Sequence, residues 1–164
     1  MTAGGPTALV NIQKTGRALR WPAVFAVGLS LCAVACVGPA KNFSVYEAKA
    51  VNSAESAQAA VETVKFAIQL ALTNRAFGPF QSVTVEDAEE DVGTAQGHFD
   101  SIQPPDAQSD QLRQQTDDLL SKAIEDVGEA RIAMRRGDIQ ALRGLLADLE
   151  KDSDQLDRFV DEHL

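Results

Sequence analysis

The C-terminal stretch Asp138–Leu164, DIQALRGLLADLEKDSDQLDRFVDEHL, decides the fold. Its apolar residues recur at steps of three and four, which places them on one face of an α-helix. Ser153 is a polar residue within that face, and Asp138 is a preferred N-cap residue at its start. We therefore predict an amphipathic helix from 139 to the C-terminus. Its predicted buried face consists of Ile139, Leu142, Leu146, Leu149, Ser153, Leu156, Val160 and His163 or Leu164.

Two runs with similar spacing lie in the middle of the chain. The first is expected to begin at Ser44, because Ser44 and Glu47 fit a capping box, and to end at Gly78-Pro79. The second opens at Thr84, followed by acidic residues that suit a helix N-terminus, and Pro104-Pro105 stops it. The predicted buried faces are Ala50, Ala54, Ala57, Val61, Val64, Ile68 and Ala71, then Val85, Ala88, Val92, Ala95, Phe99 and Ile102.

A third run starts around 106–109 and ends at Gly137, which suits a left-handed C-cap after the cations Arg135 and Arg136. Its predicted buried face is Leu112, Thr116, Leu119, Ala123, Val127, Ala130 and Met134. No comparable stretch alternates with a period of two, so the sequence predicts no strand. Helices with short connections bury their apolar faces most simply in an all-α, antiparallel up-down-up-down four-helix bundle.

The N-terminal part has the layout of an export signal. Trp21–Ala35, WPAVFAVGLSLCAVA, carries no charge and follows the basic residues Lys14, Arg17 and Arg20. Its last residues and the next one, Ala33-Val34-Ala35-Cys36, resemble the lipobox of bacterial lipoproteins. The resemblance implies cleavage between Ala35 and Cys36, and a lipid on the Cys36 sulfur. It divides the chain into a signal peptide at 1–35, a tether at 36–43 and a bundle at 44–164.

Two other interpretations of this segment stay open. Trp21–Ala40 is long enough to cross a hydrocarbon core of about 30 Å as an uncleaved signal or membrane anchor helix. A simple cleaved secretory signal is the other. All three export the C-terminal part, because the positive flank stays in the cytoplasm. Since the two cysteines are Cys32 and Cys36, the part beyond Cys36 can form no internal disulfide.

The exported part offers little that resembles a catalytic site. The part beyond Cys36 is more acidic than the whole chain. The whole chain has a formal charge of -9, and all three charges before Cys36 are positive. Nucleic acid is therefore a poor partner, because phosphate binding needs clustered cations. His98 and His163 are the two histidines, and neither follows a Glu-x-x-His spacing. With no nucleophile elbow, phosphate loop or dinucleotide motif, we predict a protein without catalytic activity and without a cofactor.

Acidic residues crowd one segment, where Glu86, Glu89 and Glu90 form a weak candidate for a cation site. A solvated first helical turn is the interpretation that we favour, because carboxylates there face the positive end of the helix dipole. No other group of residues in the sequence predicts a metal site.

These observations predict a lipid-anchored protein on the extracytoplasmic face of the cell membrane that binds another envelope protein. The C-terminal half, with FDSIQPPDAQSDQLRQQTDDLLSKA and EARIAMRRGD, also resembles bacterial helical envelope proteins that have no assigned activity. The alternative is a small-ligand or cation-binding sensor bundle held by an uncleaved transmembrane anchor. Its site would be a groove between the first two helices, lined by Phe66, Phe77, Phe80 or Phe99.

Overall fold

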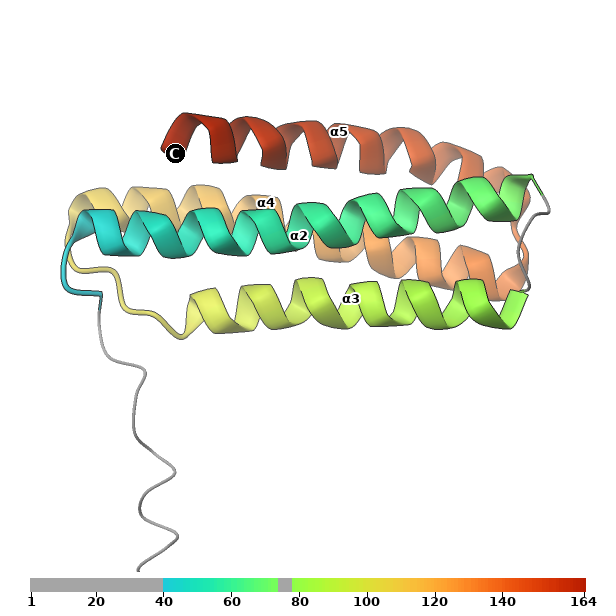
Figure 1. Ribbon diagram of the computed structural model, residues 1–164, viewed down its shortest axis with the longest axis horizontal. Helices are drawn as coiled ribbons and strands as arrows, with labels where there is room; N and C mark the ends of the chain where they lie inside the picture. The colour runs from blue at the N-terminus through green and yellow to red at the C-terminus, as the bar shows by residue number, and fades with distance from the viewer. Residues whose placement is uncertain (1–39, 74–77) are drawn as a thin grey trace, which may run out of the picture. The chain divides into compact units, whose positions relative to one another are not determined.

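The computed structural model describes residues 40–73 and 78–164, with side chains placed at 40–73 and 81–164. Within these ranges it contains four helices and no strand, which confirms the all-α prediction for this part of the chain (Figure 1). The helices are α2 (Phe43–Leu72), α3 (Gly78–Asp100), α4 (Ala107–Arg136) and α5 (Ile139–His163). The predicted signal segment, with Ala35 and Cys36, lies outside the described residues.

The start and end of α2 differ from the prediction. Its N-cap is Asn42, not Ser44, and the Asn42 side chain accepts a hydrogen bond from the Val45 amide at 3.0 Å. The backbone of Asn42 is extended, which suits an N-cap, so the cap lies two residues before the predicted Ser44. The helix ends at Thr73, whose hydroxyl donates to the Gln69 carbonyl at 2.8 Å.

The start of α3 corrects the prediction further. Gly78-Pro79 begins this helix instead of ending the previous one, and Thr84 lies inside it. Proline suits a first helical turn because it lacks an N–H that would have no partner there. As a result the first turn holds no acidic residue, and the interpretation of Glu86 as part of a dipole-favoured first turn is wrong.

The caps of α4 and α5 agree with the sequence. The Asp106 side chain accepts from the Ser109 amide at 2.8 Å, and the Asp138 side chain accepts from the Ala141 amide at 3.0 Å. Gly137 ends α4 with a φ of 66°, the left-handed conformation in which glycine avoids the steric cost of a Cβ. Two long helices are thus joined by a turn of minimal length.

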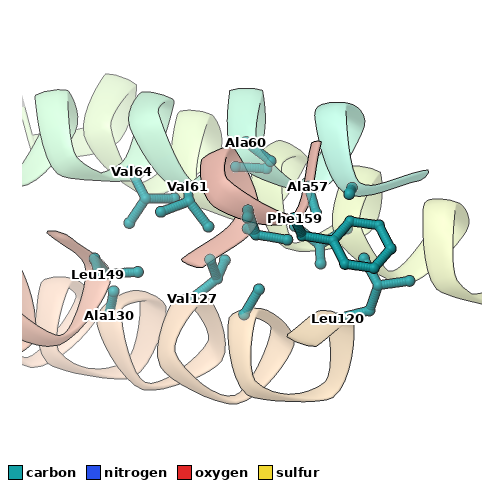
Figure 2. Close-up of a cluster of buried hydrophobic side chains, with 14 of the residues drawn as sticks. Ala57, Ala60, Val61, Val64, Leu120, Val127, Ala130, Leu149 and Phe159 are labelled. Atoms are coloured by element: carbon teal, nitrogen blue, oxygen red, sulfur yellow. The ribbon is translucent and has the colours of Figure 1, made fainter. Parts of the chain in front are cut away.

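Among the described residues, α2 and α4 each pack against the other three helices, whereas α3 and α5 do not touch each other. Figure 2 shows the resulting core, in which alanine and valine from α2 face valine, alanine and leucine from α4 and α5. Small side chains let α2 and α4 approach closely across the bundle. The four helices therefore share one core, and no described helix is apolar enough over a sufficient length to cross a membrane.

The predicted buried faces are largely confirmed, with shifts of one residue. Leu120 and Leu145 are buried, while the predicted Leu119 and Leu146 are half-buried and Ile139 is 41% exposed. On α4, contact with three helices makes the buried face wider than a single stripe, so it also takes in Leu120, Asp126 and Ala133. The predicted Ala71, Ala95 and Met134 are also half-buried.

Polar contacts between neighbouring helices follow a regular order. Along α2 and α5 they join Glu47 to His163, Gln58 to Asp157, and Lys65 to Glu150, so residue numbers rise in one helix as they fall in the other. Along α3 and α4 they join Glu89 to Arg131, Gln96 to Ser121, and Asp100 to Arg113. In both helix pairs the contacts occur in reverse sequence order.

Candidate functional site

A groove of about 710 Å³ opens between α2 and α3. On α2 its lining residues are spaced by three and four from Lys49 to Thr63, and on α3 they follow the same spacing from Thr84 to His98. Each wall therefore runs for about 21 Å at a rise of about 1.5 Å per residue. The groove exists because its walls are mostly alanine, serine and threonine, namely Ser53, Ser56, Ala59, Ala60, Thr63, Thr84, Ala88, Thr94 and Ala95.

A lysine lies at one end of the groove, and two carboxylates lie between its middle and the other, acidic end. Tyr46 and Phe99 pack with ring centroids 5.3 Å apart, so the nearby Lys49 and His98 lie at the same end of the groove. Asp87 and Asp91 line the α3 wall two to three turns away from His98. All four residues are exposed, so the charges of Lys49, Asp87 and Asp91 face solvent at the groove and can meet the charges of a bound molecule.

Two large apolar side chains stay in solvent beyond the acidic end. Phe66 is 61% exposed and lies one turn after Thr63, the last lining residue of α2. Val83 is 56% exposed and lies one turn before Asp87 on α3. The acidic end of the groove therefore continues into apolar surface.

Of the phenylalanines expected to line this groove, the two whose side chains are described do not do so. The groove lies between the expected helices, but Phe99 is buried against Tyr46 and Phe66 lies past the groove's end. Phe77 falls outside the described residues, and no side chain is described for Phe80. The lining is small and mixed in polarity, which is unlike the bulky apolar walls that enclose most small ligands.

One of the three candidate cation residues is held by an ion pair. Glu89 forms an ion pair with Arg131 of α4, while Glu86 and Glu90 are exposed. Within the part of the chain that the structure describes, no three acidic, histidine or cysteine side chains are placed to hold a metal ion. The acidic run thus contributes one ion pair between α3 and α4 and a charged outer surface.

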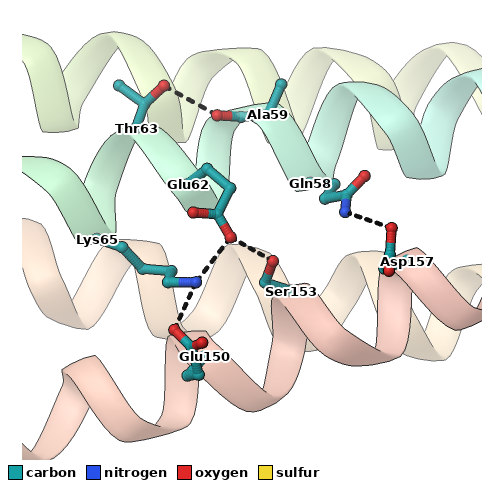
Figure 3. A network of polar contacts seen from close by, with 8 residues as sticks. All are labelled: Gln58, Ala59, Glu62, Thr63, Lys65, Glu150, Ser153 and Asp157. Atoms are coloured by element: carbon teal, nitrogen blue, oxygen red, sulfur yellow. Dashed lines mark hydrogen bonds and ion pairs between the residues drawn. The ribbon is translucent and has the colours of Figure 1, made fainter.

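A buried cation joins α2 to α5 (Figure 3). The Lys65 Nζ lies 2.7 Å from a Glu62 carboxylate oxygen and 2.5 Å from a Glu150 carboxylate oxygen, and Lys65 is 7% exposed. Burial alone would lower the pKa of Lys65, but hydrogen bonds with Glu150 and Glu62 outweigh it and raise the pKa. Hydrogen bonds from Lys65 and Ser153 lower the pKa of Glu62. We call Lys65, Glu62 and Glu150 the clasp, because the ammonium group bonds to a carboxylate on each of the two helices.

Two carboxyl groups meet in the seam between α4 and α5. Asp126 and Asp152 are 3% and 4% exposed, and one oxygen of each is buried without a hydrogen-bond partner among the described residues. Lys122 contacts the other oxygen of Asp126 at 2.5 Å. The pKa of Asp152 is raised from 3.8 to about 7. Burial, which disfavours the charged form, is the largest cause, and the interaction with Asp126 is the next. A proton held by Asp152 relieves the repulsion between two buried charges.

The sequence analysis predicted neither the ion pairs of Lys65 nor the buried pair of Asp126 and Asp152. Asp152 lies three residues after Leu149 and four before Leu156, so helical spacing alone places it on the buried face. Asp126 lies three residues after Ala123 and four before Ala130 on the buried face of α4 in the same way. The predicted buried faces were built mainly from apolar residues, so they left out Asp152 and Asp126 although helical spacing places both there.

Comparison of the chain with protein-family models, with curated proteins and with solved structures finds no match. What this protein does must therefore be argued from its own residues. Among the features described above, the groove between α2 and α3 is the one that is open to a partner and large enough to receive one.

Proposed function

We propose that the protein is a non-enzymatic binding protein of a bacterial cell envelope, anchored by a lipid on Cys36 and displayed on the extracytoplasmic face of the membrane. Its partner is another envelope protein, which binds in the groove between α2 and α3. The observation that carries this proposal is the groove itself, with small walls, Lys49 at one end, carboxylates toward the other, and exposed Phe66 beyond it. The basic and apolar segment that ends at Cys36 supports the anchor.

The bundle that we propose has up-down-up-down topology. The reverse order of the contacts between α2 and α5, and between α3 and α4, supports antiparallel packing of these pairs. The short connection through Gly137 supports it for α4 and α5. In this topology α2 and α3 also run antiparallel, and the groove lies along about 21 Å of their shared length.

The anchor is tested by Cys36→Ser, with Cys32→Ser as the matched control. We expect Cys36→Ser to abolish both the lipid mass on the mature chain and its recovery with membranes, whereas Cys32→Ser retains both. Mass spectrometry of the chain from intact cells and fractionation provide the readout. A full-length mass that is identical in both variants would instead identify the uncleaved anchor.

The groove is tested by photo-crosslinking in intact cells. A photo-reactive residue at Asn52, which is exposed on the groove wall, is compared with one at Ala147, which is exposed on α5. We expect a discrete crosslinked product from position 52 and none of the same mass from position 147. Loss of that product when Ala59→Trp fills the groove would show that the partner occupies it, and its persistence would contradict the proposal.

A further inference from the structure

Three features of the α2–α3 groove restrict what can fill it. It is straight, because each wall is a single face of a helix, and it is about 21 Å long. Small side chains line it, so a molecule that fills it must supply the large ones. An extended peptide would leave its backbone amides beside walls whose own amides are already bonded within helices.

A helix meets these conditions. Its own backbone groups are satisfied internally, and its side chains recur on one face about every 5 Å, which gives about four insertions along 21 Å. Bulky side chains that enter a groove with alanine walls bury apolar area on both partners. A second copy of this chain fits less well, because its two-helix face would span the groove without filling it.

Charge along the groove adds a requirement. An occupant must present negative charge beside Lys49, and positive charge from the middle of the groove onward, beside Asp91 and Asp87. Exposed Phe66 and Val83 lie past the acidic end, so an apolar side chain next to the basic residues of the occupant would cover them. A uniformly acidic or uniformly basic helix matches half of this surface and is repelled by the other half.

We propose that the groove binds a single amphipathic helix of the partner, with bulky aliphatic residues at steps of three and four, acidic residues at one end and basic residues at the other. The proposal rests on the proposed function and specifies the chemistry of the partner at that site. It assigns roles to residues that the bundle core does not use, since Lys49, Ala59 and Phe66 are exposed.

The probe is an acetylated and amidated helical peptide of about 18 residues, long enough for the groove at about 1.5 Å per residue. Leucine forms a stripe along one face, a pair of glutamates lies near one end, and a pair of lysines lies near the other. One photo-reactive residue stands at the edge of the stripe. The full-length protein is irradiated with this peptide in detergent, and the covalent adduct is located by mass spectrometry.

We expect adducts on the walls of α2 and α3, and a drop of about tenfold in yield for Ala59→Trp, because overfilling a packed site is costly. Ala147→Trp, an exposed alanine on α5, serves as the matched control and retains the yield. Circular dichroism confirms that both variants keep their helix content. Since detergent binding by the peptide is the same for both variants, their difference reports the groove.

Two altered peptides test the chemistry. Replacing the leucine stripe with serine is expected to abolish the adduct, and replacing the lysine pair with glutamates to lower the yield about threefold, the size of one or two exposed charge contacts. Equal yields from all peptides, or adducts scattered over α4 and α5, would overturn the helix proposal. If the crosslink from position 52 in cells then still depends on the groove, the binding function stands while its occupant is not a helix of this kind.

Discussion

Asp152→Asn is expected to remove a loss of stability that the wild-type protein suffers as pH rises. Asp152 keeps its proton in the folded protein to a pKa of about 7, whereas an aspartic acid in the unfolded chain releases it near 3.8. Folded-state proton binding stabilises the protein fully below pH 3.8, and this contribution disappears as pH rises to about 7. Asparagine does not titrate, so the variant lacks this dependence.

The size of the effect follows from the pKa difference. At about 1.36 kcal/mol per pKa unit, the rise from 3.8 to about 7 corresponds to about 4 kcal/mol as an upper value. The nearby Lys122 is 47% exposed at its side chain, so water screens the seam, and we expect roughly half of this value, about 2 kcal/mol. The asparagine amide can still donate to Asp126, which retains the contact between α4 and α5.

The assay is urea unfolding of the wild type and of Asp152→Asn at pH 4.5 and at pH 8. The free energy of unfolding of the variant, relative to wild type, should rise by about 2 kcal/mol between the two pH values. Asp154→Asn is the matched control, because Asp154 is exposed on the same helix and should follow the wild type. Parallel pH dependence in wild type and Asp152→Asn would refute the raised pKa of Asp152.

Three further substitutions test the packing. Leu149→Ala should lower the free energy of unfolding by about 2 to 5 kcal/mol, since Leu149 is fully buried, and a urea melt without such a loss would contradict its place in the core. Gly137→Ala should cost about 1 to 2 kcal/mol in thermal unfolding, because alanine is strained at a φ of 66°; an unchanged melting temperature would argue against that turn. Lys65→Met should change stability by less than about 1 kcal/mol, because the carboxylates of Glu62 and Glu150 can turn to water, and a loss above about 3 kcal/mol would show that the clasp is essential.

The helical spacing of apolar residues predicted most of the fold. The α5 face from Leu142 to Val160 was predictable because bulky residues at steps of three and four have few other ways to be buried. The first residues of α2 and α3 were not predictable. Ser44 and Thr84 are residue types that favour an N-cap about as much as Asn42, the N-cap that α2 uses. Which cap is used depends on where packing starts, and that is a tertiary effect.

The position of the groove was predictable, but its lining residues and its charge pattern were not. The alanine content of the first run indicated close approach or a groove beside α2, and the structure has that groove. Its lining was expected to be phenylalanine, yet Phe99 turns inward to Tyr46 because the ring is large enough to fill the end of the core. The charge pattern of Lys49 and Asp87 required both helices and their register, which no single run of sequence contains.

The arrangement of helices also has a consequence for local unfolding. Because α3 packs on α2 and α4 but not on α5, and contributes mainly valine and alanine to the core, it has less apolar area to lose on detaching than α5 with its leucines. Amide hydrogens of α3 should therefore exchange through partial openings that leave the other three helices folded. Since α3 is also one wall of the groove, an occupant that grips both walls would slow this exchange and couple binding to the rigidity of one quarter of the bundle.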